Sequence, residues 1–259
     1  MPDSVPLLEL SGISKRFGAV QALTEVDFQA HPGHVTALVG DNGAGKSTLV
    51  KIISGIETAD SGEYRFEGRP VNVNSPHAAS ALGIATVYQD LALSDNLDVV
   101  ANLFLGRERT GGSKLLNETA MERQASGVLK RLAVRIPSVR TQVASLSGGQ
   151  RQSVAIARSM LGEPKLVVLD EPTAALGVAQ TAQVLDLIHR LRDQGLAVVV
   201  ISHNLADVFE VADSIVVLWL GHQVGVLDAK RTNSEEVVAA ITGANLREEQ
   251  QTAAEVSER

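Results

Sequence analysis

The first third of the chain alternates short apolar runs with turn residues. This pattern predicts two or three strands between residues 7 and 39. The last of these runs, residues 35–39, ends at a glycine, and apolar residues then recur at helical spacing as far as Ile53. Two further strands are expected at residues 63–66 and 84–88, because Gly, Pro and Asn residues separate these runs from their neighbours.

The middle of the chain has a helical pattern instead. Residues 97–105 and 117–132 are expected to form two amphipathic helices, because their apolar residues recur every three or four positions. A Gly-rich loop at residues 110–113 lies between them. Another helix is expected to begin beyond Gly149 and to run to Leu161, before the next proline.

The final third alternates continuous apolar runs with helical patterns. The predicted order is a strand at 166–169, a helix at 180–192, a strand at 197–201, a helix at 205–211 and a strand at 215–220. Continuous apolar strands that alternate with helices indicate a parallel sheet covered on both faces. The polar and charged tail, residues 244–259, is expected to be frayed.

The composition is that of a globular protein. With 259 residues, 44% of them hydrophobic and 20% charged, the chain can bury a core as one large domain or two small ones. Its net charge of −7 argues against a general nucleic-acid binder, because phosphate backbones need a basic surface. The lack of cysteine excludes disulfides and thiolate metal sites. We expect neither a secretory signal nor a spanning helix, so a second chain would hold the protein at any membrane.

One Gly-rich segment matches the pattern of a phosphate-binding P-loop. Its residues are Gly40, Asp41, Asn42, Gly43, Ala44, Gly45, Lys46 and Ser47. Small residues let the backbone N–H groups converge on phosphates, and the helix that follows adds its positive end. We expect Lys46 to bridge the β- and γ-phosphates of ATP, Ser47 to ligate Mg²⁺ and Thr48 to reach the α-phosphate. The alternative is a Gly-rich turn with an exposed lysine, but the predicted strand before the loop and helix after it favour the P-loop.

A P-loop needs an acidic partner for its metal ion, and the end of a predicted buried strand supplies one. Asp170 follows the apolar run 166–169 and is expected to hold Mg²⁺ through water, because Mg²⁺ keeps most of its hydration shell. Glu171 comes next, where a carboxylate can accept a proton from the attacking water. The alternative is a solvated acidic pair at a strand end, which the P-loop makes the weaker interpretation.

A third motif separates the families that share these two elements. It consists of Leu146, Ser147, Gly148, Gly149 and Gln150, and with it the sequence resembles the ABC ATPases. We call residues 146–150 the signature segment. The same residues also predict a helix N-cap at Ser147, and both readings hold together because a helix start binds anions. The resemblance implies that Ser147, Gly149 and Gln150, in a segment that includes Gly148, close over the γ-phosphate bound by a partner subunit.

The resemblance assigns roles to three more residues. Phe17 stands where the family has an aromatic ring, often tyrosine, that stacks on adenine. Gln89 matches the glutamine that touches Mg²⁺ and the attacking water and links the site to the transmembrane partner, and His203 matches the histidine that contacts the γ-phosphate. Taken alone, such an aromatic residue belongs more often to the core, and such a histidine is more often an ordinary surface or core residue. The chain departs from the family at Gly177, where aspartate is usual, which puts the usual hydrogen bond across the dimer in doubt.

The resemblance spans about residues 7–242 and implies the fold. It is an α/β P-loop NTPase fold with a RecA-like parallel-sheet core, an N-terminal antiparallel β subdomain and an inserted α-helical subdomain. On this basis one nucleotide-binding domain is expected over residues 5–243, with the helical part at about residues 90–162. Residues 88–93, 102–108 and 173–177 resemble more finely the ATP-binding subunits of ribose-, xylose- and fructose-type sugar importers.

A sugar importer of this kind implies several partners. The chain is expected to act as a homodimer on transmembrane permease subunits, at the cytoplasmic side of the inner membrane. A sugar-binding protein outside the membrane is an indirect partner, and no nucleic acid is expected. Two other functions stay open at this point: a soluble ABC ATPase that acts on ribosomes or nucleic acid, and a regulator that binds nucleotide without hydrolysis. Which sugar is carried does not follow from these residues.

Overall fold

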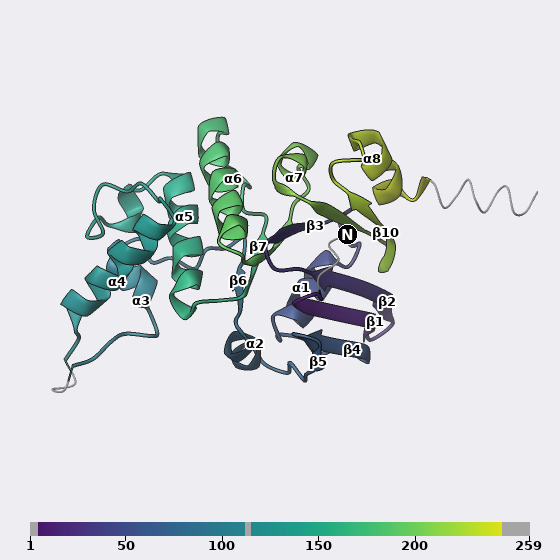
Figure 1. Ribbon diagram of the computed structural model, residues 1–259, viewed down its shortest axis with the longest axis horizontal. Coiled ribbons are helices and arrows are strands. Elements are labelled where there is room, and N and C mark those ends of the chain that lie inside the picture. Colours follow the sequence, from purple (N-terminus) through teal and green to yellow (C-terminus); the bar gives the residue numbers. More distant parts are fainter. Residues whose placement is uncertain (1–4, 112–114, 245–259) are drawn as a thin grey trace, which may run out of the picture.

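A computed structural model describes residues 5–111 and 115–244 of the chain. Its N-terminal part is an antiparallel sheet with the strand order β2-β1-β4-β5, seen at the lower right of Figure 1. The strands are β1 Leu8–Phe17, β2 Val20–Ala30, β4 Ser61–Phe66 and β5 Arg69–Pro70. Alternate residues of β1, such as Leu8 and Leu10, are fully buried, which gives the sheet one apolar face.

The second sheet forms the core and has the order β10-β9-β3-β8-β7-β6. Its strands are β3 His34–Gly40, β6 Ile84–Val87, β7 Leu166–Asp170, β8 Ala197–Ile201, β9 Ser214–Trp219 and β10 His222–Asp228. All pairs are parallel except β9–β10. Every residue of β8 is buried, as expected for a strand covered on both faces.

Helices cover both faces of the core sheet. They are α1 Lys46–Ile53, α2 Pro76–Leu82, α3 Val99–Phe104, α4 Glu118–Arg131, α5 Gly148–Ser159, α6 Val178–Asp193, α7 Leu205–Val211 and α8 Ser234–Thr242. Helix α1 packs between the two sheets, because one apolar cluster joins its Leu49 and Ile53 to β1, β3 and β8. Helices α3, α4 and α5 gather in a lobe at the left of Figure 1, which we call the helical lobe.

Most predicted elements are confirmed, and four α-helices or β-strands are additional. Strand β5 and helix α2 lie between the predicted strands β4 and β6, and β10 and α8 follow the last predicted strand. The helix expected at residues 97–105 begins at Val99, because the side chain of Asp98 caps it. The loop at residues 110–113 is only partly described, and the tail after residue 244 lies outside the described residues.

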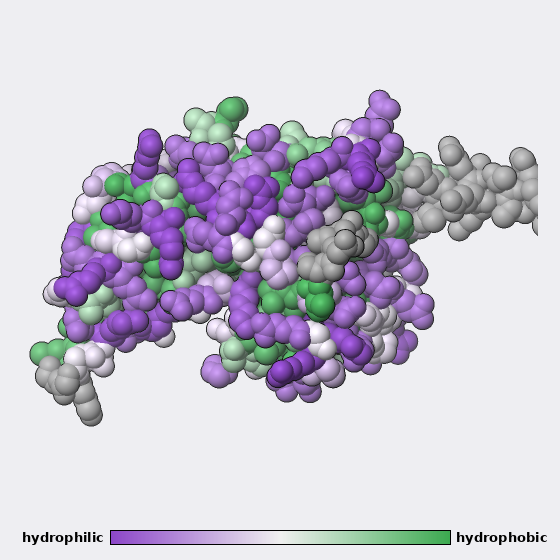
Figure 2. All heavy atoms as spheres, in the orientation of Figure 1, coloured by the Kyte–Doolittle hydropathy of each residue, from purple (hydrophilic) through white to green (hydrophobic). Residues whose placement is uncertain are grey.

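Hydrophilic residues cover most of the face that Figure 2 shows, with separate hydrophobic patches between them. Across the ranges 5–111 and 115–244, no helix combines the length and the apolar character that crossing a membrane requires.

Candidate functional site

The P-loop connects β3 to α1 and is pressed between two other strands. A Cβ atom on Gly40, whose φ is 154°, would lie 2.4 Å from the carbonyl oxygen of Leu218 in β9. A Cβ atom on Gly45, whose φ is 102°, would lie 2.7 Å from the carbonyl oxygen of Ala22 in β2. Only glycine fits at both positions, because each combines a left-handed φ with a backbone contact. The loop is therefore held in its curled form from two sides.

The curled loop presents hydrogen-bond donors. The first hydrogen bond of α1 runs from the Leu49 N–H to the Gly45 carbonyl, so the N–H groups of the first turn have no partner within the helix. Helix α1, which the structure describes in full, has no side-chain cap and no acidic residue in its first turn. The Lys46 ammonium donates to the carbonyls of Gly40 and Asp41 at 2.7 and 2.9 Å, at the same end of the helix. Such a helix start fits a phosphate group.

The second part of the site lies at the end of β7. The Glu171 N–H donates to the Ile201 carbonyl of β8 at 2.9 Å, and Glu171 has a left-handed φ of 49°. This backbone directs Glu171 toward the end of the neighbouring strand, where His203 follows β8. The Nδ1 atom of His203 lies 2.8 Å from Oε2 of Glu171. The Glu171 side chain is 16% exposed and that of His203 is 74% exposed, so the pair lies at the edge of the site.

Charges from the P-loop and from β7 act on each other. Burial lowers the pKa of Lys46, while the nearby carboxylates of Glu171, Asp41 and Asp170 oppose this change. Burial also raises the pKa of Asp170, the negative charge of Glu171 adds to this effect, and Lys46 opposes it. The ammonium and the two strand-end carboxylates are therefore near enough to act on one bound ligand. Adjacent parallel strands β3, β8 and β7 bring them together, because all three end at the same edge of the sheet.

The loop after Glu171 is tied to helix α7. The Thr173 hydroxyl donates to Oδ2 of Asp207 at 2.6 Å, and the Ala174 N–H donates to the Glu171 carbonyl. Asp207 was not singled out from the sequence. Its place as an acidic residue in the first turn of α7 could have indicated a structural role. The loop ends at Gly177, which is the N-cap of α6 but has an extended backbone and no side-chain cap. A Cβ atom at this position would meet nothing within 4 Å, so the backbone does not require glycine here.

The signature segment begins helix α5, and Ser147 is its N-cap, as predicted. The Gln150 N–H donates to the Ser147 hydroxyl, and the Ser147 N–H donates to Oε1 of Gln150, which completes a capping box. The side-chain amide of Gln150 also donates to the Arg135 carbonyl at 3.1 Å. Gln150 therefore orders the start of α5, and its contact with a phosphate stays a prediction.

The two signature glycines allow α5 to approach α6 closely. A Cβ atom on Gly149 would lie 3.0 Å from Cβ and 3.3 Å from Cα of Gln180 in α6. A Cβ atom on Gly148 would lie 2.9 Å from Cδ2 of Leu176. The sequence did not predict the packing role of Gln180, because no sequence pattern indicates that the starts of α5 and α6 contact each other. The glycines thus join the signature segment to the loop that follows Glu171.

The remaining predicted residues lie on other edges of the site. Phe17 ends β1 and is 42% exposed, with the Lys15 ammonium 5.3 Å from its ring centroid. Gln89 is exposed and follows β6, the strand beside β7. Among the residues that the structure describes, the signature segment makes no hydrogen bond or ion pair to Lys46 or Glu171. One chain therefore brings together the P-loop, the strand-end acids and His203, but not the signature segment.

Comparison with known proteins decides the family. A family model described as ABC transporter matches residues 23–174. This chain belongs to the ABC transporter family. The fructose import ATP-binding protein FrcA of Rhizobium meliloti is 47% identical over 246 residues, which cover 92% of this chain and 95% of that protein. The xylose/arabinose import ATP-binding protein XylG of Sulfolobus acidocaldarius is 46% identical over 236 residues, which cover 91% and 94%.

A solved structure agrees with this family. The ADP conformation of MJ1267, an ATP-binding cassette of an ABC transporter, superposes with a TM-score of 0.80 at 26% identity, and the match covers 95% of this chain and 98% of that one. The ABC fold class expected from the signature segment is confirmed. So is the finer resemblance to fructose- and xylose-type import subunits.

Proposed function

We propose that this chain binds and hydrolyses ATP as the motor subunit of a transporter that imports a sugar. The observation that carries this proposal is the meeting of the P-loop with Asp170, Glu171 and His203 at one edge of the core sheet. The names of the two import proteins point to a monosaccharide and favour transport over action on ribosomes or nucleic acid. The acids at the strand ends favour hydrolysis over binding alone.

The residues present fit a nucleotide with its magnesium ion. The triphosphate would lie against the N–H groups of the loop and the start of α1, with Lys46 at the terminal phosphates and Thr48 at the α-phosphate. Hydroxyl, carboxylate and amide oxygens from Ser47, Asp170 and Gln89 are the ligand types that Mg²⁺ prefers. Once bound, the ion would neutralise charge on the phosphates and orient them. The exposed ring of Phe17 offers its face to the adenine.

The protein's own part in hydrolysis is a proton transfer. Glu171 would accept a proton from the attacking water, and its carboxylate is held in place because His203 contacts Oε2. Its left-handed backbone fixes the direction of the side chain. Lys46 and His203 would stabilise the negative charge that develops on the terminal phosphate.

A second copy of the chain completes the site in this proposal. Within one described chain the signature segment does not touch the P-loop, although its serine-capped helix start offers hydrogen-bond donors. We propose that Ser147, Gly148, Gly149 and Gln150 of one copy face the P-loop of the other, so that two ATP molecules are bound between two copies. Each unit would be one domain over residues 5–243, with about residues 90–162 as its inserted helical part.

The membrane partner would dock where the helical lobe meets the core. A groove of about 360 Å³ lies there, lined by α2, β6, α5 and the residues after β6. Its wall includes Arg107 and Arg158, and neither makes an ion pair with a carboxylate in the described part of the chain. Burial lowers the pKa of Arg158, and the positive charge of Arg107 lowers it further. Two such cations favour an acidic side chain from the partner.

This arrangement gives the protein its place in the cell. We propose that permease subunits hold it at the cytoplasmic side of the membrane, and that a sugar-binding protein on the other side acts on it only through them. The two arginines of the groove support a protein partner of opposite charge, and the overall charge of −7 disfavours a nucleic-acid partner.

Phosphate release in the presence of Mg²⁺ tests the proposal. The chain purified with its permease should hydrolyse ATP, and addition of a fructose- or xylose-binding protein with its sugar should raise the rate. Glu171→Gln should lower kcat by about 10²–10⁴-fold, the usual contribution of a general base, and should still bind ATP. Glu210→Gln, an exposed change on α7, should behave like the parent. A Glu171→Gln variant with the parental rate would refute the assignment of Glu171.

A further inference from the structure

The stretch of chain that leads into the signature segment is fastened along its length to helix α3. We call residues 138–146 the approach segment. Four backbone hydrogen bonds join it to the start of α3 and the residues before it. They run from Val99 N to Thr141 O, Val100 N to Val139 O, Val143 N to Leu97 O and Ala144 N to Asp95 O, at 3.0–3.1 Å. The approach segment and α3 therefore move together unless these bonds break.

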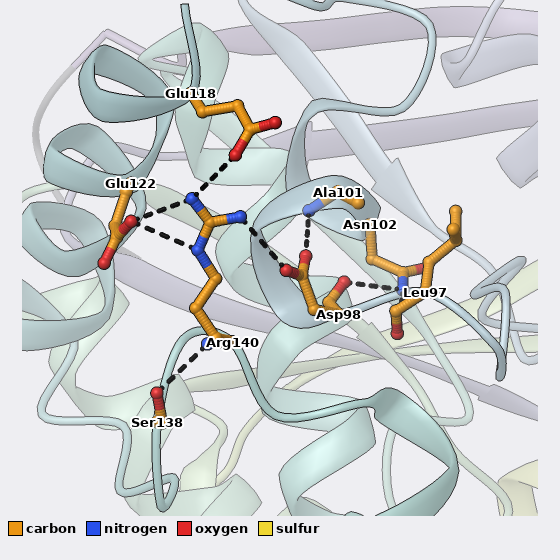
Figure 3. A network of polar contacts seen from close by, with 8 residues as sticks. All are labelled: Leu97, Asp98, Ala101, Asn102, Glu118, Glu122, Ser138 and Arg140. Carbon is orange, nitrogen blue, oxygen red and sulfur yellow. Dashed lines mark hydrogen bonds and ion pairs between the residues drawn. The ribbon is translucent and has the colours of Figure 1, made fainter.

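One side chain of the approach segment gathers carboxylates from two helices. Figure 3 shows the guanidinium group of Arg140 between Asp98, Glu118 and Glu122. It donates to Oε2 of Glu122 at 3.1 and 2.9 Å, to Oε2 of Glu118 at 3.2 Å and to Oδ2 of Asp98 at 3.3 Å. Glu118 and Glu122 lie on α4, while Asp98 begins α3. Arg140 thus joins α3, α4 and the approach segment through one guanidinium group.

The contact with Asp98 is the one that bears on α3. The other oxygen of Asp98, Oδ1, accepts the Ala101 N–H at 2.7 Å and so caps the helix. Asn102 is fully buried in the next turn of α3. Its side-chain amide donates to the carbonyls of Leu97 and Asp98 and so fixes the backbone at the start of the helix. The start of α3 is therefore rigid, and Arg140 holds the approach segment to this rigid point. Without the guanidinium, three carboxylates would face one another with no cation between them.

The far end of the approach segment is fixed by a second arginine. Arg151, in the first turn of α5, donates to the carbonyls of Ala144 and Leu146 at 2.8 and 3.2 Å. It also lies 3.3 Å from Oδ1 of Asp95, just ahead of α3. The approach segment is thus held at one end by Arg140 and at the other by Arg151, and Ser147 follows directly. Hydrogen bonds and ion pairs therefore connect α3 to Ser147 without interruption, so a shift of α3 can displace Ser147.

We propose that Arg140 is a positioning residue that transmits a displacement of α3, caused by the membrane partner, to Ser147 and so to hydrolysis. This inference rests on the proposed function, which places the membrane partner in the groove that Arg107 lines. The Arg107 N–H donates to the carbonyl of Phe104, the last residue of α3, at 2.8 Å, so a partner in the groove would act on α3. Arg140 itself touches no nucleotide. Arg140 keeps the approach segment attached to α3 while the helical lobe moves. Its loss therefore uncouples the movement of α3 from the position of Ser147.

The test compares ATP hydrolysis by the permease complex with hydrolysis by the isolated chain. Arg140→Met should lower the ratio of these two rates at least fivefold, while the KM for ATP stays within twofold because the P-loop is untouched. Arg140→Lys should restore part of the ratio, since an ammonium group can pair with one carboxylate but lacks the planar fork that reaches three. Arg123→Met is the matched control. It also removes one positive charge from the helical lobe, on α4, but it breaks no ion pair of the described chain. It should leave the ratio of the two rates unchanged.

A second variant keeps the inference testable if Arg140→Met folds poorly. Asp98→Asn retains a good helix cap but removes the charge that Arg140 holds, and it should lower the ratio as well. If Arg140→Met and Asp98→Asn change both rates by one common factor, or change neither, the inference is overturned and the proposed function stands. If the parental complex itself hydrolyses no ATP, the proposed function falls, and this inference falls with it.

Discussion

Alanine at the two signature glycines separates packing from nucleotide binding. In Gly149→Ala the new Cβ atom would lie 3.0 Å from Cβ and 3.3 Å from Cα of Gln180, and the Cα atom cannot move without α6. In Gly148→Ala the new contacts are Cδ2 of Leu176 at 2.9 Å and Oε1 of Gln180 at 3.1 Å, which are ends of side chains that can rotate. Gly149→Ala therefore requires the backbone of α6 to move, whereas Gly148→Ala requires only side chains to rotate.

The magnitudes follow from this difference. Overpacking against fixed atoms costs about 1–3 kcal/mol, and the better helix propensity of alanine offsets up to about 1 kcal/mol of it. We expect Gly149→Ala to lower the free energy of unfolding by about 1–2 kcal/mol, a few degrees in the thermal midpoint, and Gly148→Ala to stay within about 0.5 kcal/mol of the parent. Because α5 must tilt away from α6, Gly149→Ala should also displace Ser147 and slow hydrolysis.

Urea unfolding followed by circular dichroism measures both variants side by side. The reasoning would be refuted if Gly149→Ala were as stable as the parent, or if Gly148→Ala were the more damaging of the two. Either result would mean that the start of α5 does not rest on α6 as the structure places it.

Three further substitutions test other parts of the structure. Gly177→Asp should add a side-chain cap and a favourable charge at the start of α6, raising the free energy of unfolding by a few tenths to about 1 kcal/mol; an unchanged thermal midpoint would contradict this. Asn102→Ala should lower it by about 2–4 kcal/mol in urea, because buried backbone groups lose their partners; a loss below about 1 kcal/mol would count against that network. Burial lowers the pKa of His34 below 6.5, with Asp213 opposing, so the unfolded chain binds more protons as the pH falls through that value and stability is lost on acidification. His34→Gln should reduce this loss between about pH 7.5 and 5.5, and an unchanged loss of the free energy of unfolding over that range would contradict this.

The core of the fold could be predicted because its strands are unambiguous. The run that forms β8 is apolar throughout, and β3 leads directly into the glycines of the P-loop, so both position and direction followed from the pattern. Helices α2 and α8 were missed although they carry ordinary signals. Ser75 and Asn233 cap them, and Gly83 and Gly243 end them. Strand β10 was missed because it is a partly exposed edge strand with a mixed pattern.

The site was predictable in its residues and less so in its contacts. Parallel strands that end at one edge explain why Glu171 and His203 meet, but the left-handed backbone of Glu171 has no signal in the sequence. The capping role of Ser147 was expected, whereas the bond from Gln150 to the Arg135 carbonyl depends on how the helical lobe folds back. Contacts between residues distant in sequence require the assembled fold, which local patterns do not contain.

A structure of the Glu171→Gln variant with ATP and Mg²⁺ tests the central claim most directly. Two copies should enclose two nucleotides, with each terminal phosphate within hydrogen-bonding distance of Lys46 from one copy and of Ser147 from the other. If every nucleotide-bound assembly instead keeps Ser147 remote from the phosphates, the account of this chain as a two-copy ATP motor is contradicted.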